Sequence, residues 1–372
     1  MSRILIAPDS FKGSATSLEV ANAIAKGWQS VRPRDELIKI PFADGGEGTL
    51  LAIEGAQPTA KRIYCPDVSP DAYWLLINES TAIVELAQTS GLTLLKSLDP
   101  LGAHTHGFGQ VLAMAAQDSR VERIYCALGG SASTDAGVGA LMALGAKFLD
   151  GASLSIGFGG GQLSKIESIS TSEIIEAPKG GVVLLVDVQS PLLGKDGAAS
   201  VFSAQKGATN EQIGVLENGL EHFVSLTGFL DCPGSGAAGG TAYGLCALWN
   251  ATIENGAMKI ADLSGIDSAM IGIDLVITGE GQLDNQSFRG KVVGYISERA
   301  NVVGVPIAYC VGSVVGDFPS TCLGGVSLST IAGSSAQAME NPEKYLIEAG
   351  GQLTHFLKDF SIMDIRNTLE SH

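Results

Sequence analysis

Residues 4–31 read Ile-Leu-Ile-Ala-Pro-Asp-Ser-Phe-Lys-Gly-Ser-Ala-Thr-Ser-Leu-Glu-Val-Ala-Asn-Ala-Ile-Ala-Lys-Gly-Trp-Gln-Ser-Val. The first four residues form a short, continuous apolar run, typical of a strand that is covered on both faces. A polar loop follows, and from residue 17 apolar side chains recur at helical spacing. The stretch therefore predicts a strand, a loop and an amphipathic helix, which is the repeating unit of a parallel α/β fold.

The same unit recurs outward along the chain. Further apolar runs are predicted as strands at residues 37–42, 83–86, 124–128, 182–186, 275–278, 307–311 and 326–331. Helical spacing appears at residues 138–144, 211–226 and 291–303, and the tail after residue 349 is predicted as one amphipathic helix. The fold class is α/β, with two α/β domains.

We expect one of these domains to be a doubly wound, flavodoxin- or Rossmann-like parallel sheet that an inserted domain interrupts. With 372 residues the chain exceeds what one core usually supports. Residues 1–62 and 266–372 are predicted to form the Rossmann-like domain, and residues 63–265 the inserted, glycine-rich α/β domain. The active site is expected in the cleft between them.

Composition excludes several classes of protein. Hydrophobic residues make up 45% of the chain and charged residues 17%, which is typical of a well-buried globular protein. A net charge of −16 argues against nucleic acid or an anionic membrane as partner. The six cysteines form no CxxC pair and are expected to be free, buried thiols. No apolar run reaches membrane-spanning length and no signal peptide is recognisable, so we expect a cytoplasmic protein.

Carboxylates follow several of the predicted strands, where open parallel sheets bind ligands. They are Asp9, Asp44, Asp187, and then Glu280 with Asp284. Any one of them could be a helix cap or turn former, but several at one edge favour a site. In the first loop, Ser10 and Lys12 either hold an anion at a helix N-terminus or belong to a capped turn. In the second, Gly45 and Gly46 allow close approach of the backbone to a ligand, and Asp44 and Glu47 could bind substrate hydroxyls or a magnesium water, unless the turn is only structural.

Two glycine-rich loops are candidates for phosphate binding. The loop at 129–137 could form a nest of N–H donors or a tight packing turn, and its candidate residues are Gly129, Gly130, Ser131, Ser133 and Asp135. The familiar GxxxxGK[ST] loop is absent from the chain. Gly234, Gly236 and Gly239 match GxGxxG, but a helix and a loop precede them instead of a strand, so a ligand-side loop or structural packing is favoured over an NAD site. Lys206 adds a cation beside glycines.

The segment 277–291 brings opposite charges together. Glu280 and Asp284 lie in a long loop, and Arg289 and Lys291 come at the opening of the next helix. Only 23 lysines and arginines serve the whole chain, so two on one loop suggest a clamp for an anion, with a surface ion pair as the alternative.

Seven segments in order resemble the bacterial glycerate kinase family. They are APDSFKGS at 7–14, FADGGEGT at 42–49, ELAQTSGL at 85–92, LGGSASTDAG at 128–137, the pair DVQSPLLG and FSAQKGAT at 187–194 and 202–209, PGSGAAGG at 233–240, and VITGEGQLDNQSFRGK at 276–291. The resemblance implies a kinase that uses ATP and Mg²⁺ to phosphorylate D-glycerate, with 2-phosphoglycerate favoured over 3-phosphoglycerate. It also implies two α/β domains. Gln282, Ser190, Thr134 and the segment 104–110 depart from the family pattern.

The roles of the site residues are hypotheses. Asp187 and Asp44 would orient the substrate hydroxyl, take its proton or hold the metal, and Lys291, Arg289 and Lys12 would clamp the acid and the γ-phosphate. Asp9, Ser10, Gly45, Gly46, Glu47 and Asp284 complete the substrate set. The glycine loops, with Lys206 and Glu280, would hold ATP.

Two other functions stay open on the sequence alone. An NAD-dependent hydroxy-acid dehydrogenase is suggested by the GxGxxG match, and a non-catalytic protein that binds a small acid or nucleotide is the other alternative. The partners expected are small molecules, with the protein a monomer or a homodimer. His104 and His106 are expected in a solvated loop.

Overall fold

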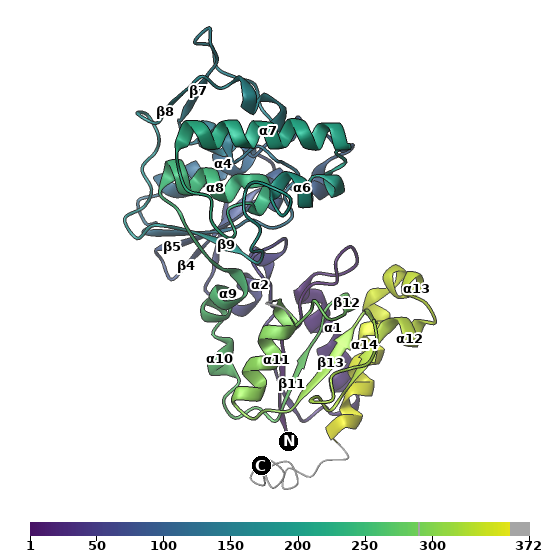
Figure 1. Ribbon diagram of the computed structural model, residues 1–372. Coiled ribbons are helices and arrows are strands. Elements are labelled where there is room, and N and C mark those ends of the chain that lie inside the picture. Colours follow the sequence, from purple (N-terminus) through teal and green to yellow (C-terminus); the bar gives the residue numbers. More distant parts are fainter. Residues whose placement is uncertain (289–290, 358–372) are drawn as a thin grey trace. The chain divides into compact units, whose positions relative to one another are not determined.

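The computed structural model describes residues 1–288 and 291–357 of the protein, and the chain divides into two compact units (Figure 1). The terminal unit consists of Met1–Asp44, Leu51–Pro58 and Ala257–His372, and the inserted unit of Gly45–Leu50 and Thr59–Gly256. The chain therefore first changes unit within the loop after Asp44, earlier than the limit at 62 set from composition. Each unit has its own hydrophobic core.

The terminal unit is built on a five-stranded, fully parallel sheet with the order β15–β13–β11–β1–β2. The strands are β1 (Arg3–Ile6), β2 (Glu36–Lys39), β11 (Leu275–Thr278), β13 (Ile307–Val311) and β15 (Gly324–Ser327). Numbered within the unit, this order is the 2-1-3-4-5 of a flavodoxin-like fold, whose switch point lies between β1 and β11. The predicted fold class is confirmed.

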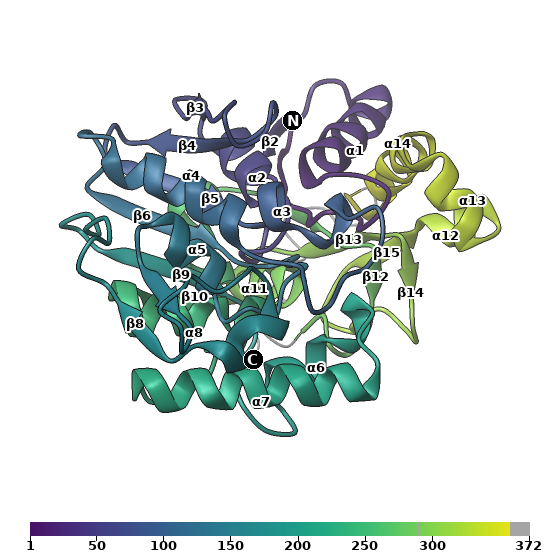
Figure 2. The same cartoon turned by 90° about the horizontal axis from the view of Figure 1, so that it is seen from above.

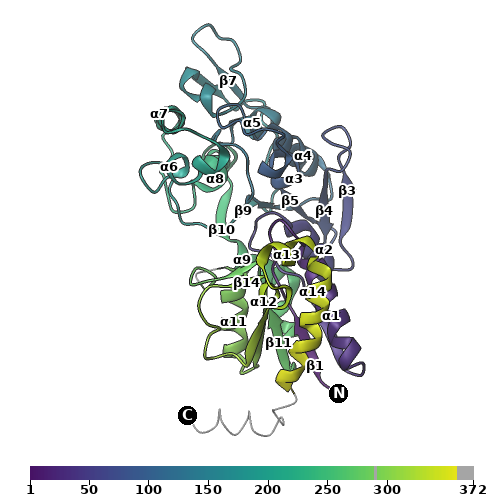
Figure 3. The same cartoon turned by 90° about the vertical axis from the view of Figure 1, so that its right-hand side faces the viewer.

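Helices cover both faces of this sheet (Figure 3). Helix α1 (Ser17–Val31) and helix α14 (Pro342–Leu353) lie side by side on one face, and α11 (Val292–Val302) lies on the other. Gly27 and Gly350 allow the close crossing of α1 and α14, because a Cβ on Gly27 would lie 1.9 Å from the carbonyl oxygen of Ile347. The other helices of the terminal unit are short: α9 (Gly256–Ser264), α10 (Ile266–Ala269), α12 (Leu328–Ala332) and α13 (Ser335–Glu340).

The inserted unit contains a six-stranded mixed sheet with the order β10–β9–β6–β5–β4–β3. The first four strands are parallel: β10 (Thr252–Asn255), β9 (Val182–Val186), β6 (Arg123–Ala127) and β5 (Thr81–Glu85). At the other edge, β4 (Tyr73–Ile77) and β3 (Lys61–Tyr64) run antiparallel, and the apolar-run criterion missed them. β7 (Lys147–Leu149) and β8 (Ser168–Ser170) form a small separate antiparallel pair.

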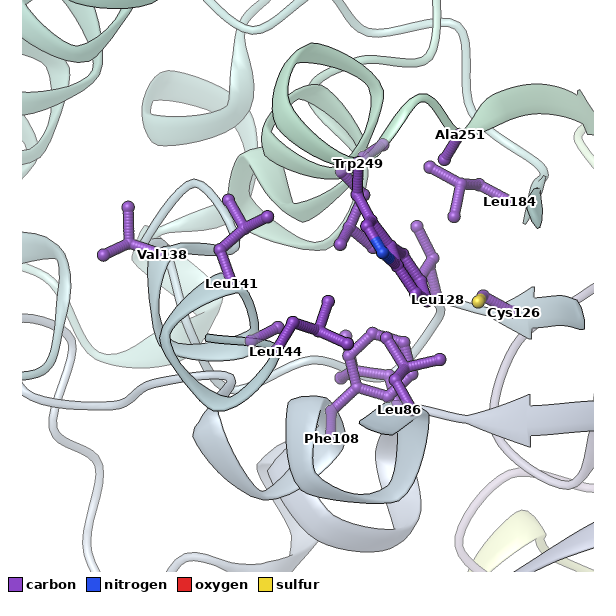
Figure 4. Packing of buried hydrophobic residues seen from close by; sticks show 14 of the residues in the cluster. Leu86, Phe108, Cys126, Leu128, Val138, Leu141, Leu144, Leu184, Trp249 and Ala251 are labelled. Carbon is purple, nitrogen blue, oxygen red and sulfur yellow. The ribbon is translucent and has the colours of Figure 1, made fainter. Parts of the chain in front are cut away.

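The helices of the inserted unit are α4 (His106–Gln117), α5 (Val138–Ala143), α6 (Ala198–Phe202), α7 (Asn210–Thr227) and α8 (Ala237–Trp249), with the short α3 (Ala87–Ser90). Helix α2 (Thr49–Ala56) begins in this unit and ends in the terminal unit. Figure 4 shows the core of the inserted unit, where Phe108 and Leu144 pack near Trp249. Thr209 and Gln212 form a capping box that starts α7, as Thr16 and Glu19 do for α1.

Two predicted elements are wrong in part. The apolar run 326–331 is strand only as far as Ser327, and α12 begins at Leu328, because a short apolar run does not distinguish a strand from a buried helix. The tail helix was placed after residue 349, but α14 begins at Pro342, where the fixed φ of proline favours the first helical turn, and it ends at Leu353. Residues 358–372 lie outside the described residues.

All six cysteines are free, as predicted, but only Cys65, Cys126 and Cys310 are buried, and the other three are partly exposed. Among the described residues, no helix combines the length and the apolar character that crossing a membrane requires.

Candidate active site

The terminal unit has a cavity of about 400 Å³ at the carboxyl ends of β1 and β11. These strands flank the switch point of the sheet, which is where doubly wound folds bind ligands. Four carboxylates and two lysines line the cavity: Asp9, Asp44, Glu280, Asp284, Lys12 and Lys291. Asp44 and Lys291, which lie 247 positions apart (291 − 44) in the sequence, therefore share one cavity.

Asp9 lies at the end of β1 and is partly buried. Its backbone N–H donates to the carbonyl oxygen of Gly279 at 2.8 Å, and its Oδ1 accepts from the N–H of Ser10 at 2.6 Å. Removal from solvent, and next the carboxylate of Asp44, raise the pKa of Asp9 to about 8, although Ser10 and Lys12 oppose the shift. Asp9 is therefore protonated at neutral pH and can donate a hydrogen bond.

Glu280 begins the long loop that follows β11. Gly279 is required before it, because a Cβ there would lie 1.5 Å from the carbonyl oxygen of Cys310. Burial raises the pKa of Glu280, while Ser287 and Lys291 act against that shift. Its Oε1 is buried and has no hydrogen-bond partner in the part of the chain that the structure describes. A buried carboxylate oxygen left in this way is ready to accept from a ligand.

Asp284 shapes the same loop, since its Oδ1 accepts from the N–H of Gln286 at 2.7 Å and of Ser287 at 3.3 Å. Lys291 comes directly before α11, at its N-cap position. Arg289, predicted to clamp the substrate, lies outside the described residues.

The inserted unit brings together the loop 45–47 and the loop 129–137. The N–H of Gly129 donates to the carbonyl oxygen of Gly45 at 3.2 Å. A Cβ on Gly129 would lie 2.4 Å from the Cα of Gly46, so only glycine allows this approach. Gly45, Gly46 and Glu47, predicted to bind substrate, therefore lie against the predicted phosphate loop.

Lys206 is buried beneath the loop 129–137, with 3% of its surface exposed. Its Nζ donates to Ser131 Oγ at 3.0 Å and to the carbonyl oxygen of Ser133. Burial lowers the pKa of Lys206 to about 8, although Asp135 raises it. The hydroxyl of Ser133 is buried without a hydrogen-bond partner among the described residues. A lysine, a spare hydroxyl and a glycine loop are together suited to an anion.

The loop 234–240 contacts the same region. A Cβ on Gly239 would lie 2.1 Å from the carbonyl oxygen of Ser133, and the N–H of Ala136 donates to the carbonyl oxygen of Gly239 at 3.0 Å. Gly236 is equally constrained, since its Cβ would lie 2.1 Å from the carbonyl oxygen of Pro191. The residues predicted to bind nucleotide are thus brought together from three segments, with Glu280 as the exception because it belongs to the terminal unit.

Asp135 has a supporting position. It is 1% exposed, and Oδ2 accepts from the N–H and the hydroxyl of Thr105, both at 2.8 Å. The N–H groups of Gly137 and Gly139 also donate to its carboxylate, each at 3.2 Å. With these donors engaged, the carboxylate holds the loop in shape.

Asp187 directly follows β9 in the inserted unit and is exposed. A catalytic role was predicted for Asp187 together with Asp44 and Lys291. Asp187, however, belongs to a different unit from the other two.

Comparison with known proteins identifies the family to which the whole chain belongs. The model of the glycerate kinase family matches residues 4–358. The chain belongs to the glycerate kinase family. It is 37% identical over 332 residues to "Glycerate kinase" of Bacillus subtilis and 36% identical over 330 residues to "Glycerate 2-kinase" of Escherichia coli, each match covering 85% of this chain and 86% of the relative.

A solved structure supports the fold of this family member. The crystal structure of "putative glycerate kinase 2" from Salmonella typhimurium LT2 superposes with a TM-score of 0.78 at 32% identity, covering 96% of this chain and 98% of the other. Two predictions are therefore confirmed: the chain belongs to the glycerate kinase family, and it is an enzyme of this family. The GxGxxG match at 234–239 overlaps the start of α8 and follows a loop, not a strand, so it lacks the setting of a dinucleotide fingerprint.

Sequence reasoning missed Glu85 in this glycerate kinase family member. This carboxylate ends β5 and is 6% exposed, and it accepts from the N–H of Gly48 at 3.0 Å and of Leu50 at 2.9 Å. Burial raises its pKa to about 7. Through these two hydrogen bonds Glu85 fixes the end of the loop that follows Asp44 and the first turn of α2. The rule that selected Asp9 and Asp187, a carboxylate at the carboxyl end of a predicted strand, would also have selected Glu85.

The expectation of a solvated loop is wrong for His106, which begins α4, whereas His104 does lie in a loop. Both are partly buried and pack against Phe158, with ring centroids 4.6 and 4.7 Å from it. His106 begins α4, and its Nδ1 lies 3.3 Å from the carbonyl oxygen of Gly139. The aromatic contact with Phe158 comes from a distant segment and was not visible in the local pattern.

Proposed function

We propose that this protein transfers the γ-phosphoryl group of ATP to a hydroxyl of D-glycerate and forms 2-phosphoglycerate in preference to 3-phosphoglycerate. Family membership supports the kinase activity, and one of its relatives is a glycerate 2-kinase. The observation that carries the proposal is the cavity in which Asp9, Asp44, Lys12 and Lys291 gather at the switch point of the terminal unit.

The terminal unit is proposed to bind the acid. Its cavity of about 400 Å³ suits a small ligand, and Lys12 and Lys291 are the cations that line it. Lys12 and Lys291 are proposed to bind the carboxylate of the acid, and the four carboxylates of the same cavity are left for its hydroxyl groups. Protonated Asp9 and the unpartnered Oε1 of Glu280 supply a donor and an acceptor for hydroxyl groups.

The inserted unit is proposed to bind the nucleotide. The loop 129–137 offers backbone N–H groups, Ser131 and Ser133 offer hydroxyls, and Lys206 supplies positive charge from below. Asp135 keeps this loop in shape through Thr105 and Gly137.

Phosphoryl transfer requires positioning and charge neutralisation more than covalent chemistry. Asp44 or Asp187 is proposed to orient the substrate hydroxyl and to take its proton as the phosphoryl group arrives. Lysines 12 and 291 would offset the negative charge of the acid and the phosphate. The hypothesis that acid and nucleotide react at one shared site belongs to this proposal.

Mg²⁺ is proposed to bind together with the phosphates of ATP. The described residues contain no cluster of three or more His, Cys, Asp or Glu side chains that could hold a metal. Kinases, however, usually hold Mg²⁺ through one or two carboxylates together with the substrate phosphates, and Asp44 or Asp187 could provide them. When bound, Mg²⁺ neutralises charge on the phosphate oxygens.

The test is release of ADP, coupled to a reporter, with a panel of small hydroxy acids, followed by ³¹P NMR of the product. We expect glycerate to be the best substrate and 2-phosphoglycerate the main product. ADP release with other acids but not with glycerate would reject the substrate, and 3-phosphoglycerate would reject the position. The proposed location in the cytoplasm and small-molecule partners follow from this activity.

Two variants test the roles of single residues. Asp187→Asn and Lys291→Met should each lower kcat for glycerate by at least about 100-fold while the protein stays folded. The exposed neighbours Lys195 and Asp196 provide the controls Lys195→Met and Asp196→Asn. A kcat within about tenfold of the unsubstituted enzyme would reject the catalytic role of the residue concerned.

A further inference from the structure

A second cavity, of about 430 Å³, lies in the inserted unit beside the ends of β9 and β10. The two strands are parallel, with Asn255 opposite Val186 at their carboxyl ends. Residues after β9, residues of β10 and the loop before α8 all contribute to the lining. The cavity reaches the carboxyl end of β9 and extends from Ala251 along the whole of the edge strand β10 to Asn255. The roles assigned so far do not use it.

The glycine loop 234–240 joins this cavity to the phosphate loop. A Cβ on Gly234 would lie 3.3 Å from Ile253 Cγ2 and 3.4 Å from the carbonyl oxygen of Val188, and both of these residues line the cavity. At its other end the loop contacts Ser133 through Gly239. One continuous segment thus runs from the cavity to the loop above Lys206.

The lining of the cavity suits a flat heteroaromatic ring. Val188, Ile253 and Phe229 present apolar surface, Gln189 and Asn255 add amide groups, and Glu254 adds a carboxylate. Phe229 is 38% exposed and meets Tyr243 edge-on, with ring centroids 5.7 Å apart at 78°. Apolar walls with a few amides are the usual surroundings of a bound base, whose faces stack while its edge forms hydrogen bonds.

We propose that this cavity binds the purine base of the nucleotide, with the phosphates on the loop 129–137. The inference rests on the proposed function, because it takes ATP as the phosphoryl donor. It adds the site that distinguishes a nucleotide from inorganic polyphosphate.

Cys232 provides a direct test, because it lines the cavity and is partly exposed. ADP should slow alkylation of Cys232 by iodoacetamide by about tenfold or more at saturation, measured by peptide mass spectrometry. Inorganic tripolyphosphate and glycerate should leave the rate unchanged. Cys322, partly exposed in the terminal unit, is the internal reference. Equal rates with and without saturating ADP, or equal protection by tripolyphosphate, would overturn the proposal.

Kinetics gives an independent test. Phe229→Ala should raise the KM for ATP about tenfold and leave kcat and the KM for glycerate within about twofold. Leu230→Ala is the matched control, since Leu230 is 84% exposed and lies next to Phe229. Gln189→Ala, at an exposed position, is the second variant should Phe229→Ala not fold. An unchanged KM for ATP in a folded variant would place the base elsewhere.

The two proposals fail in different ways. An unsubstituted protein that releases no ADP with glycerate contradicts the proposed function, whatever Cys232 does. An active kinase whose Cys232 is not protected by ADP contradicts only the assignment of the cavity.

Discussion

At Asp9, burial and a neighbouring carboxylate together raise the pKa so far that this aspartate is neutral at pH 7. Its pKa of about 8 means that the folded protein keeps a proton there that the unfolded chain has already released at lower pH. Stability contributed by this group is therefore lost as pH rises from the ordinary carboxyl range to about 8. The same shift makes Asp9 a hydrogen-bond donor at the site at neutral pH.

Asp9→Asn should remove this pH dependence. Asparagine keeps an oxygen for the Ser10 N–H but cannot ionise. The free energy of unfolding of the variant minus that of the unsubstituted protein should be about 1–2 kcal/mol larger at pH 8.5 than at pH 5. Thermal unfolding at both pH values measures it, with Asp317→Asn at an exposed position of the same unit as control. The same difference in Tm at both pH values would contradict the raised pKa.

Lys206 shows the opposite shift, because burial disfavours its charged form and lowers its pKa to about 8. ADP binding should weaken as pH rises through about 8, since the protonated ammonium group attracts the phosphates. Lys206→Met should weaken ADP binding about 100-fold at pH 7 and abolish this pH dependence. Calorimetric titration between pH 7 and 9 measures both effects. Lys195→Met, at an exposed lysine, should change neither, and persistent pH dependence in Lys206→Met would assign it to another group.

At the scale of elements, the loops are positioned by contacts between segments far apart in sequence. Glu85 at the end of β5 holds the start of α2, and glycines allow the loops 45–47, 129–137 and 234–240 to touch. The glycine contacts join backbone atoms, and Glu85 uses a carboxylate outside the proposed ligand-binding set. The loops are therefore positioned without the side chains that are proposed to bind ligands.

Glu85→Gln should lower kcat for glycerate more than it changes the KM for either substrate. Glutamine has one acceptor oxygen in place of two, so the N–H of Gly48 or Leu50 loses its partner and the loop after Asp44 shifts. We expect a loss of about tenfold in kcat and about 1–2 kcal/mol in stability. Steady-state kinetics and denaturant unfolding measure them, with exposed Glu122→Gln as control. A kcat equal to that of the control would contradict the positioning role.

Gly129→Ala should separate the loops 45–47 and 129–137. The added Cβ would come within 2.4 Å of the Cα of Gly46, and backbone there must move. We expect a loss of about 2–3 kcal/mol in stability and at least about tenfold in kcat/KM for ATP. Gly214→Ala in α7 is the control, since a Cβ there meets no atom within 4 Å and alanine favours the helix. If both variants melt alike, the close approach of the loops does not matter.

At the scale of the whole molecule, two units with separate cores carry the two proposed ligands. Glycerate should slow hydrogen exchange in the loops after β1 and β11 of the terminal unit. ADP should slow it at 129–137 and 234–240 of the inserted unit. A ligand at about 100 times its Kd stabilises the state that binds it by about 2.7 kcal/mol, which is ample for detection by mass spectrometry. Protection of the terminal-unit loops by ADP alone would contradict this division.

The sequence by itself determined the α/β class, the family and most strands and helices, because apolar periodicity and capping residues act locally. It also pointed to the carboxylates and glycines that follow the strands. It did not reveal the antiparallel β3 and β4 or the start of α12 at Leu328, because short apolar runs identify neither an edge hairpin nor the change from strand to helix. The packing of His104 and His106 on Phe158 depends on a partner distant in sequence.

Only the tertiary structure decided which candidates share a cavity. Asp44 and Lys291 line one cavity, and Gly45 and Gly46 pack against Gly129. The carboxylates of Asp135 and Glu85 accept hydrogen bonds from backbone N–H groups. The tertiary structure also set the pKa values of Asp9 and Lys206, because burial and neighbouring charge act through space and follow no pattern along the chain.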